Sequence, residues 1–445
     1  MFVFIFTLLL IIINIYCFVK KKYLYLFIPC MLFLPKYYGL EVSSSLPILT
    51  ASRIMFIVFY FYAFFNRKKS LNLKEFSFKK LSLEYKLLIG YFVFRLVSNI
   101  YYLPKYTQPA KAIMEIIFEQ LLLVIAFYLL APTKEEINTT MKILVYTATI
   151  FFILGILESL SGVRLFNALY TVSRGMVNEY YYRLGLLRAT TSLLMPGTYG
   201  NMCILMLPLI LYMYQQTSFK RYLVSVGLCS LAIVHSGSRA VMMYLAVLLF
   251  IYFIYVIRTK EARIRFSKNC ITIVACIFVF VAVASLQNPL YKYYYVTSGK
   301  SVLNEVGFDF DLSEGAPANT SFGTNSHGSR SRIRQLSGIL YTSRINPILG
   351  LGAGAQQRAD VHYYWDNHWH PVGSYDLGIV EIFCNEGLVG TIGMLFCILA
   401  LLLLCKHNRI YILMFIAYIL STLNTANMYP FLMLYVVLLL EYRQE

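Results

Sequence analysis

Charged side chains are scarce in this sequence of 445 residues. Asp, Glu, Lys and Arg make up 13% of it, whereas hydrophobic residues make up 59% and the mean hydropathy is +0.64. A soluble globular domain contains about 25% charged residues, so the composition excludes that class. Apolar runs long enough to cross a bilayer recur along the chain, and they predict an all-α, polytopic membrane protein.

Several motifs are also absent. The nine cysteines lie in or beside apolar runs without CxxC spacing, so they suggest neither a disulfide framework nor a thiolate metal site. The glycine-rich stretch from Asn346 to Gly354 lacks the strand and helix context of a nucleotide-binding loop. The sequence shows neither the internal repeat nor the recurring broken segments that would indicate a secondary transporter. The net charge of +18 comes largely from lysines of predicted cytoplasmic loops, so no nucleic-acid partner is expected.

Windows of about 20 apolar residues predict about 13 membrane spans, within a range of roughly 12 to 14. The first segment carries no positive charge before Lys20, so it is expected to be a span and not a cleaved signal peptide. With the N-terminus outside, every strongly basic short connection falls in the cytoplasm. The predicted spans are 2–19, 23–40, 46–65, 84–103, 110–131, 139–158, 197–214, 220–236, 239–257, 269–287, 375–405, 409–424 and 427–441.

Two long outer connections interrupt this pattern. We predict a transmembrane bundle over residues 1–287, which includes an outer loop at 159–196, then a large outer loop over 288–374 and C-terminal transmembrane helices over 375–445. Loops on a rigid scaffold commonly carry binding and catalytic residues, so function is expected in the two outer loops.

Arginine outnumbers lysine on the predicted outer side, whereas lysine dominates inside. Orientation requires only positive charge, but a planar guanidinium suits bidentate binding of phosphate. We therefore expect an anionic ligand at the outer face, although single arginines can also pair with carboxylates or lipid headgroups. The outer set is Arg164, Arg174, Arg183, Arg188, Arg239, Arg330, Arg332, Arg334, Arg344 and Arg358.

One of these arginines lies in a tight turn between two apolar runs. In the run from His235 to Arg239, backbone N–H groups, two hydroxyls and a guanidinium can converge on a phosphate. A turn that only reverses the chain needs Gly and Ser but no Arg, so we predict a functional Arg239.

Charged residues also occur inside predicted spans. Arg95 and the pair Glu115 and Glu119 lie at comparable depths, with the carboxylates one helical turn apart. We interpret this trio as an internal ion pair that sets helix packing, with a proton or ion pathway as the alternative.

Both tryptophans, Trp365 and Trp369, lie in the short polar stretch from Tyr363 to His370. Aromatic faces stack on sugar C–H groups while Asp, Asn and His take the hydroxyls, so the stretch predicts a sugar-binding site. Three alternatives stay open: an interfacial aromatic belt, a surface loop without a ligand, and a divalent metal site. The metal site would draw on Asp360, His362, Asp366, His368 and His370.

The order of these motifs resembles the bacterial O-antigen polymerase and O-antigen ligase superfamily over roughly residues 180–405. The motifs are an Arg-containing loop before Pro196-x-x-x-Gly200, the Ser238-Arg239 turn, Arg332 and Arg334 before Asn346-Pro-x-x-Gly-x-Gly, the His-bearing stretch, and Asp376 before Asn385-Glu-Gly. The resemblance implies a fold like the C-type glycosyltransferases. It also implies metal-independent, cofactor-free transfer of glycan from undecaprenyl diphosphate to a sugar hydroxyl, outside the cytoplasmic membrane.

The resemblance also suggests residue roles. Arg239, Arg188, Arg183, Arg332 and Arg334 would bind the diphosphate, and Trp365, Trp369 and Tyr364 would stack on sugar. The general base would be His368, His370 or Asp376.

Ligases of the superfamily place a His before an Asn upstream of their Gly-x-x-Gly segment. Here Asn367 precedes His368, and Asp376 occupies the corresponding neighbourhood, which favours a polymerase of O-antigen or capsule repeat units. A ligase or related oligosaccharyltransferase is the alternative, and an exporter of lipid-linked sugars is the third hypothesis. Besides the lipid-linked oligosaccharide, the expected partners are membrane lipids and a chain-length regulator protein. The expected location is the bacterial inner membrane, with the active site on the periplasmic face.

Overall fold

The computed structural model describes residues 2–41, 48–69, 79, 81–172, 177, 179–317 and 328–443. Within these residues the fold is helical, and strands occur only in three two-stranded antiparallel pairs. Seven of the described helical segments are long and apolar enough to cross a membrane. The predicted all-α membrane class is therefore confirmed, whereas the number of spans and the C-type glycosyltransferase fold stay predictions. Arg174 lies outside the described residues, as does the side chain of Arg330.

Contacts divide the chain into two units that alternate along the sequence. Unit 1 comprises residues 1–140, 327–408 and 422–445, and unit 2 comprises 141–326 and 409–421. The predicted outer loop 288–374 is thus divided, because its first half packs in unit 2 and its second half packs in unit 1.

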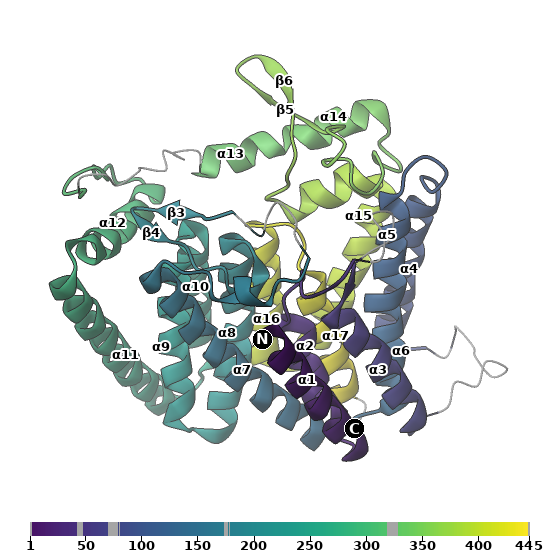
Figure 1. Cartoon of the computed structure of the whole chain (residues 1–445), viewed down its shortest axis with the longest axis horizontal. Helices are drawn as coiled ribbons and strands as arrows, with labels where there is room; N and C mark the ends of the chain where they lie inside the picture. The colour runs from purple at the N-terminus through teal and green to yellow at the C-terminus, as the bar shows by residue number, and fades with distance from the viewer. Residues whose placement is uncertain are drawn as a thin grey trace. The chain divides into compact units, whose positions relative to one another are not determined.

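Unit 1 holds most of the N-terminal and C-terminal helices (Figure 1). Its helices are α1 (Phe2–Val19), α2 (Tyr23–Phe33), α3 (Ala51–Phe65), α4 (Leu83–Ile100), α5 (Gln108–Met114), the π-helix η2 (Glu115–Leu121), α6 (Leu122–Leu130), α13 (Gly328–Gln335), α14 (Ser337–Ile345), α15 (Gly378–Cys405) and α17 (Tyr429–Arg443). Its strand pairs are β1 (Gly39–Leu40) with β2 (Leu49–Thr50) and β5 (His362–Trp365) with β6 (His368–Pro371).

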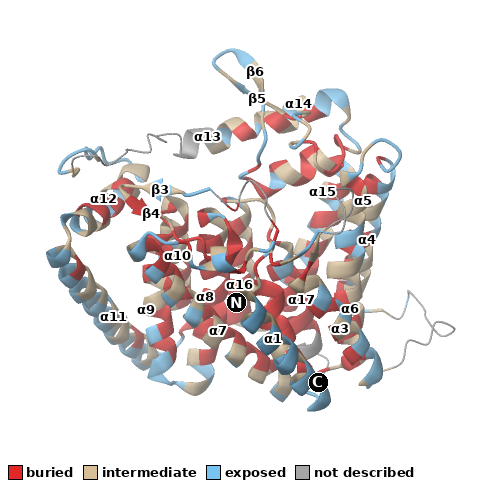
Figure 2. Cartoon of the chain, in the orientation of Figure 1, coloured by how far each residue is buried: buried red, intermediate tan, exposed pale blue. Residues whose placement is uncertain are grey.

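Unit 2 is built around a central buried helix, α8. Its elements are α7 (Lys134–Ser161, of which the first turns fall in unit 1), η3 (Leu165–Leu169), β3 (Tyr182–Arg183), β4 (Leu186–Leu187), η5 (Thr191–Leu193), α8 (Pro196–Thr217), α9 (Lys220–His235), α10 (Arg239–Ile251), the π-helix η6 (Tyr252–Val256), α11 (Lys260–Gln287), α12 (Pro289–Glu305) and α16 (Arg409–Thr422). Figure 2 shows α8 buried along most of its length and α11 largely exposed. The exposed side chains of α11 are mainly apolar, as expected of a helix that faces lipid.

Helix α15 of unit 1 is broken at Gly387, whose φ of 64° and ψ of −158° are accessible essentially to glycine alone. The break frees the amides of Leu388 and Val389 and the carbonyls of Cys384 and Asn385. A loop from Pro347 to Gly352 takes all four. The two amides donate to Pro347 and Ile348, while Leu351 and Gly352 donate to Cys384 and Asn385, over distances of 2.8 to 3.1 Å. The Asn-Pro-x-x-Gly-x-Gly and Asn-Glu-Gly motifs are thus one structural element, and no backbone group of these four is left unpaired in a membrane.

A buried ion pair stabilises this element. Glu386, next to the break, accepts from Arg95 of α4 through both carboxylate oxygens, with the shortest contact at 2.6 Å. Arg95 also donates to the Tyr91 hydroxyl at 2.9 Å. Close packing of α4 on α15 supports the pair, because a Cβ at Gly393 would lie 3.0 Å from the Phe94 side chain.

The predicted ion pair of Arg95 with Glu115 and Glu119 is therefore wrong. The two glutamates lie in the π-helix η2 and bind Arg53 of α3 instead, at 3.3 Å and 2.8 Å. A charge on one span has several depth-matched partners, and only helix packing decides among them.

The loop docking predicts that Gly350→Ala destabilises the protein. Gly350 has φ +69°, and an added Cβ would lie 2.6 Å from the Gly387 nitrogen, so the backbone would have to shift. We expect a loss of about 2–4 kcal/mol, measured by thermal or denaturant unfolding in detergent. Gly373→Ala is the control, because nothing lies within 4 Å of its added Cβ. Equal stability of both variants would contradict the docking.

Candidate functional site

Three of the predicted phosphate-binding arginines lie together in unit 2. The run from Arg183 to Arg188 forms a two-residue hairpin, in which Leu184 and Gly185 adopt positive φ between β3 and β4. Arg183 ends one strand and Arg188 follows the other. Arg183 is thus at the turn end of the pair and Arg188 at its open end, yet both side chains reach Gly237, where an added Cβ would lie 3.0 Å from Arg188 Nε and 3.3 Å from Arg183 Cδ.

This hairpin docks on the turn between α9 and α10, the predicted Ser-Gly-Ser-Arg turn. Three consecutive carbonyls of the turn are used. The Ala189 amide donates to His235 at 2.9 Å, Arg188 Nε donates to Ser236 at 2.8 Å, and an Arg183 Nη donates to Gly237. Because each guanidinium has five N–H donors, these bonds orient both side chains and leave most of their donors for a ligand.

Arg239 is the first residue of α10, where the helix N-terminus adds positive potential. Burial together with the charges of Arg239 and Arg188 lowers the pKa of Arg183 to about 10. Burial also lowers the pKa of Arg188. The nearby carboxylate is Glu305, which binds Arg239 Nη1 at 2.9 Å. Three cations with one carboxylate form a site whose charge an anion would balance.

A buried polar network holds the residues that follow the β3–β4 hairpin. Glu158 of α7 accepts from the amides of Thr190 and Thr191 and from the Thr190 hydroxyl, at 2.7 to 3.3 Å. Arg164 donates to the same hydroxyl at 2.9 Å and to the Leu194 carbonyl at 3.0 Å. Arg164, also a member of the outer arginine set, is thus a buried structural residue.

His235 ends α9 directly before the turn and is fully buried. Its Nδ1 lies 3.0 Å from the Ser159 hydroxyl, and its Nε2 lies 2.9 Å from the Tyr295 hydroxyl. Both ring nitrogens are thereby satisfied, so His235 holds the turn between α7 and α12.

The aromatic and histidine-rich stretch in unit 1 is a β-hairpin and not an irregular loop. Asp366 and Asn367 form its two-residue turn with φ of 49° and 63°. Figure 1 shows the hairpin projecting from α14 and α15. Two-residue turns with positive φ at both positions, flanked by aromatic strands, are typical of hairpins, so the sequence contained this signal.

Strand alternation separates the two tryptophans. Trp365 pairs with His368 and Tyr363 pairs with His370 on one face of the hairpin, and the Trp365 and His370 rings stack at 3.9 Å. Trp369 lies on the other face, where it contacts Tyr364 at 5.2 Å. The residues predicted to stack on one sugar therefore form two separate surfaces.

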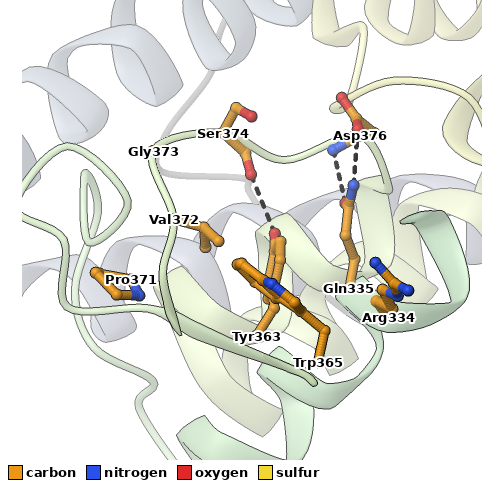
Figure 3. A pocket seen from close by; sticks show the side chains of 9 residues that line it. All are labelled: Arg334, Gln335, Tyr363, Trp365, Pro371, Val372, Gly373, Ser374 and Asp376. Carbon is orange, nitrogen blue, oxygen red and sulfur yellow. Dashed lines mark hydrogen bonds between the residues drawn. The ribbon is translucent and has the colours of Figure 1, made fainter. Parts of the chain in front are cut away.

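The face with Trp365 lines a pocket of about 500 Å³, within the usual range for small-ligand sites (Figure 3). The Asp376 carboxylate and amide both bind Gln335, at 2.7 Å and 2.9 Å. The Tyr363 hydroxyl donates to the Ser374 carbonyl at 3.1 Å. The lining residues are Arg334, Gln335, Tyr363, Trp365, Pro371, Val372, Gly373, Ser374 and Asp376.

Three arginines of the predicted outer set serve local structure in unit 1. Arg332 donates to the Asn424 side chain. Arg344 lies over the Trp369 ring at 5.7 Å. Arg358 pairs with Asp360 at 2.7 Å, so this carboxylate is engaged away from the hairpin.

The histidines of the hairpin also diverge. His362 packs against Tyr341 at 4.6 Å on the Trp369 face, whereas His368 and His370 lie on the opposite face. Across the described residues, no three His, Cys, Asp or Glu side chains converge as a metal site requires. The residues of the alternative metal site are thus not brought together.

Two site residues were missed by sequence reasoning. Gln335 is buried and holds Asp376, but a Gln at a helix end carries no distinguishing signal. Glu305 binds Arg239 from a helix 66 positions further along the chain, and no local pattern predicts that contact.

A sequence model of the O-antigen ligase family matches residues 224–395. The match supports the resemblance of this segment to the O-antigen ligase and polymerase superfamily. The matched segment contains Arg239, Glu305, the β5–β6 hairpin, Asp376 and the break in α15, and it begins after Arg183 and Arg188. Members of this family are membrane glycosyltransferase-like enzymes that act on lipid-linked oligosaccharides. No curated protein matches the chain in a sequence comparison.

The arginine cluster predicts that Arg239→Lys weakens diphosphate binding although the charge is kept. A lysine cannot bind two phosphate oxygens in a planar arrangement, so we expect roughly a tenfold or greater loss of affinity for pyrophosphate. Isothermal titration of the purified protein measures this. Arg263→Lys is the control, because Arg263 of α11 instead contacts the carbonyls of Ile254 and Ile257 and the Phe253 ring. Equal affinities of the two variants would reduce Arg239 to a charge without a bidentate role.

Proposed function

We propose that this protein is a polymerase of polyprenyl-diphosphate-linked oligosaccharide repeat units, as of O-antigen or capsule. The observation that carries the proposal is that the chain holds two candidate sites with the chemistry that a donor and an acceptor require, each at least partly inside the segment that the family model matches. One is a cluster of three arginines, and the other is a pocket lined by Trp365, Arg334 and Asp376. A cationic site suits a lipid diphosphate donor, and an aromatic pocket with a carboxylate suits a sugar hydroxyl acceptor.

At the donor, departure of the diphosphate from the anomeric carbon develops negative charge on the leaving oxygen. Arg183 and Arg188 are oriented by the turn carbonyls before any ligand binds. Donors fixed in advance stabilise such charge without the cost of reorganisation. The arginine cluster therefore supplies the main electrostatic stabilisation of the leaving group.

At the acceptor, Asp376 is the base that the geometry favours among the three candidates. Its carboxylate lines the pocket and is held by Gln335. His370 stacks on Trp365 and supports that ring, whereas His368 is exposed near the hairpin turn. The base takes the proton of the acceptor hydroxyl as its oxygen bonds to the anomeric carbon.

A ligase is the second candidate, because the family match covers ligases and related polymerases. The two activities differ only in the acceptor. A polymerase requires a second lipid-linked repeat unit, whereas a ligase requires a lipid A core or a protein.

The first test supplies the purified protein with one lipid-linked repeat unit and no other acceptor. We expect a ladder of products on a gel. Addition of the chelator EDTA should not suppress this ladder. Product formation only after addition of a lipid A core or protein acceptor would establish a ligase instead. Loss of the ladder with EDTA and its return with added divalent metal would overturn the metal-independent mechanism.

The second test separates the base from the aromatic surfaces. Asp376→Asn should lower the transfer rate about 10²–10⁴-fold while pyrophosphate affinity is kept, because a base acts on the acceptor. His370→Ala should cause a smaller loss, which appears mainly as a raised KM for the acceptor. Trp369→Ala is the control for a hairpin aromatic outside the pocket. Full activity of Asp376→Asn, with loss in His370→Ala, would transfer the role of base to His370.

A further inference from the structure

The ion pair between Arg239 and Glu305 is placed against the dipoles of both helices that carry it. Arg239 is the first residue of α10, and Glu305 is the last residue of α12. A cation at a helix N-terminus and an anion at a helix C-terminus are each disfavoured by the macrodipole. The positions of these charges therefore do not serve the stability of their own helices. They serve the site between the helices, where α10 and α12 pack together.

The pair is also accessible to a ligand. The side chains of Arg239 and Glu305 remain 17% and 20% exposed, so neither is sealed in the protein interior. Glu305 acts on more than its direct partner, because its charge partly offsets the lowering of the Arg183 pKa by burial and by the other two arginines. One carboxylate thus partly neutralises a cluster of three guanidiniums.

The transfer reaction makes this counterion consequential. The bond between the anomeric carbon and the diphosphate oxygen breaks, and its electron pair stays on that oxygen. The acceptor oxygen bonds to the carbon and its proton passes to the base. The lipid diphosphate therefore changes from a diester with a charge of about −2 to a monoester with a charge approaching −3 at neutral pH. The product therefore binds the same arginines more tightly than the substrate does, and its slow release would limit turnover.

We propose that Glu305 is an internal counterion that competes with the diphosphate for Arg239 and thereby speeds release of the polyprenyl diphosphate product. This inference rests on the proposed transferase function. In the unliganded site Glu305 holds Arg239, and the diphosphate displaces the carboxylate when it binds. After transfer the tethered carboxylate returns to Arg239 and lowers the affinity of the site for the departing product. Tethering gives the carboxylate a high effective concentration, which lowers the apparent affinity of the site by a constant factor.

The test compares Glu305→Gln with the wild type in the full-length purified protein. Glutamine keeps the shape of the side chain and removes the charge. We expect pyrophosphate and undecaprenyl diphosphate to bind roughly tenfold more tightly, equivalent to about 1.4 kcal/mol, with the change in the dissociation rate. Steady-state kcat should fall, whereas the first turnover should remain as fast as in the wild type. Equal or weaker binding of both probes by Glu305→Gln would overturn the proposal.

Glu314→Gln is the matched control, because Glu314 is an exposed carboxylate that pairs with Lys300 of α12 at 2.7 Å. This variant should bind and turn over as the wild type does. In the double variant Arg239→Lys with Glu305→Gln, the gain in affinity should shrink, because the contested guanidinium is gone. An undiminished gain would show that Glu305 acts by another route and would overturn the competition.

The same titrations distinguish failure of this inference from failure of the proposed function. If the wild type binds neither probe, or if Arg239→Lys binds both as the wild type does, the arginine cluster is not a diphosphate site. If binding depends on Arg239 but not on Glu305, the site stands and only the counterion role falls. Should Glu305→Gln fail to fold, Glu305→Asp offers a second measurement. Its shorter carboxylate should reach Arg239 less well and raise the affinity for pyrophosphate, and unchanged affinity would count against the proposal.

Discussion

The interlock between the break in α15 and the loop at residues 347–352 is the constraint on which unit 1 depends. A broken helix at membrane depth exposes two amides and two carbonyls, each of which costs free energy unless it is bonded. Here one loop supplies all four partners, and Arg95 binds the glutamate beside the break. The pocket depends on this arrangement, because Asp376 lies two residues before the start of α15 and α14 packs on the same helix.

The arginine cluster of unit 2 obeys a different physical rule. Three guanidiniums repel one another, and burial adds a desolvation cost to each charge. Part of this cost is offset by the hydrogen bonds of Arg183 and Arg188 to backbone carbonyls of the turn. The carboxylate of Glu305, which pairs with Arg239, offsets a further part. Charges held in an unfavourable environment are a common property of functional sites, because the ligand then provides the missing compensation.

The degree to which the site could be predicted differs between its parts. The Ser-Gly-Ser-Arg turn and the two arginines of the neighbouring loop were recognisable, because glycine, serine and arginine in those positions have few purely structural uses. The hairpin was not recognised as such, although Asp366 and Asn367 between aromatic runs carried the signal. Without the strand assignment, Trp365 and Trp369 read as one surface, whereas alternation places them on opposite faces. Residue spacing is informative only once its period is known.

By itself, the sequence determined the membrane class, because composition and local periodicity need no knowledge of distant contacts. From side-chain type it also predicted the chemistry of the candidate ligands. Tertiary structure alone decided which charges meet. Arg95 binds Glu386 from a position 291 residues away, and Glu115 and Glu119 bind Arg53. The same holds for Gln335 with Asp376 and for Glu305 with Arg239. Coulomb attraction is not selective among partners of opposite sign, so the packing of the helices that carry the charges makes the choice.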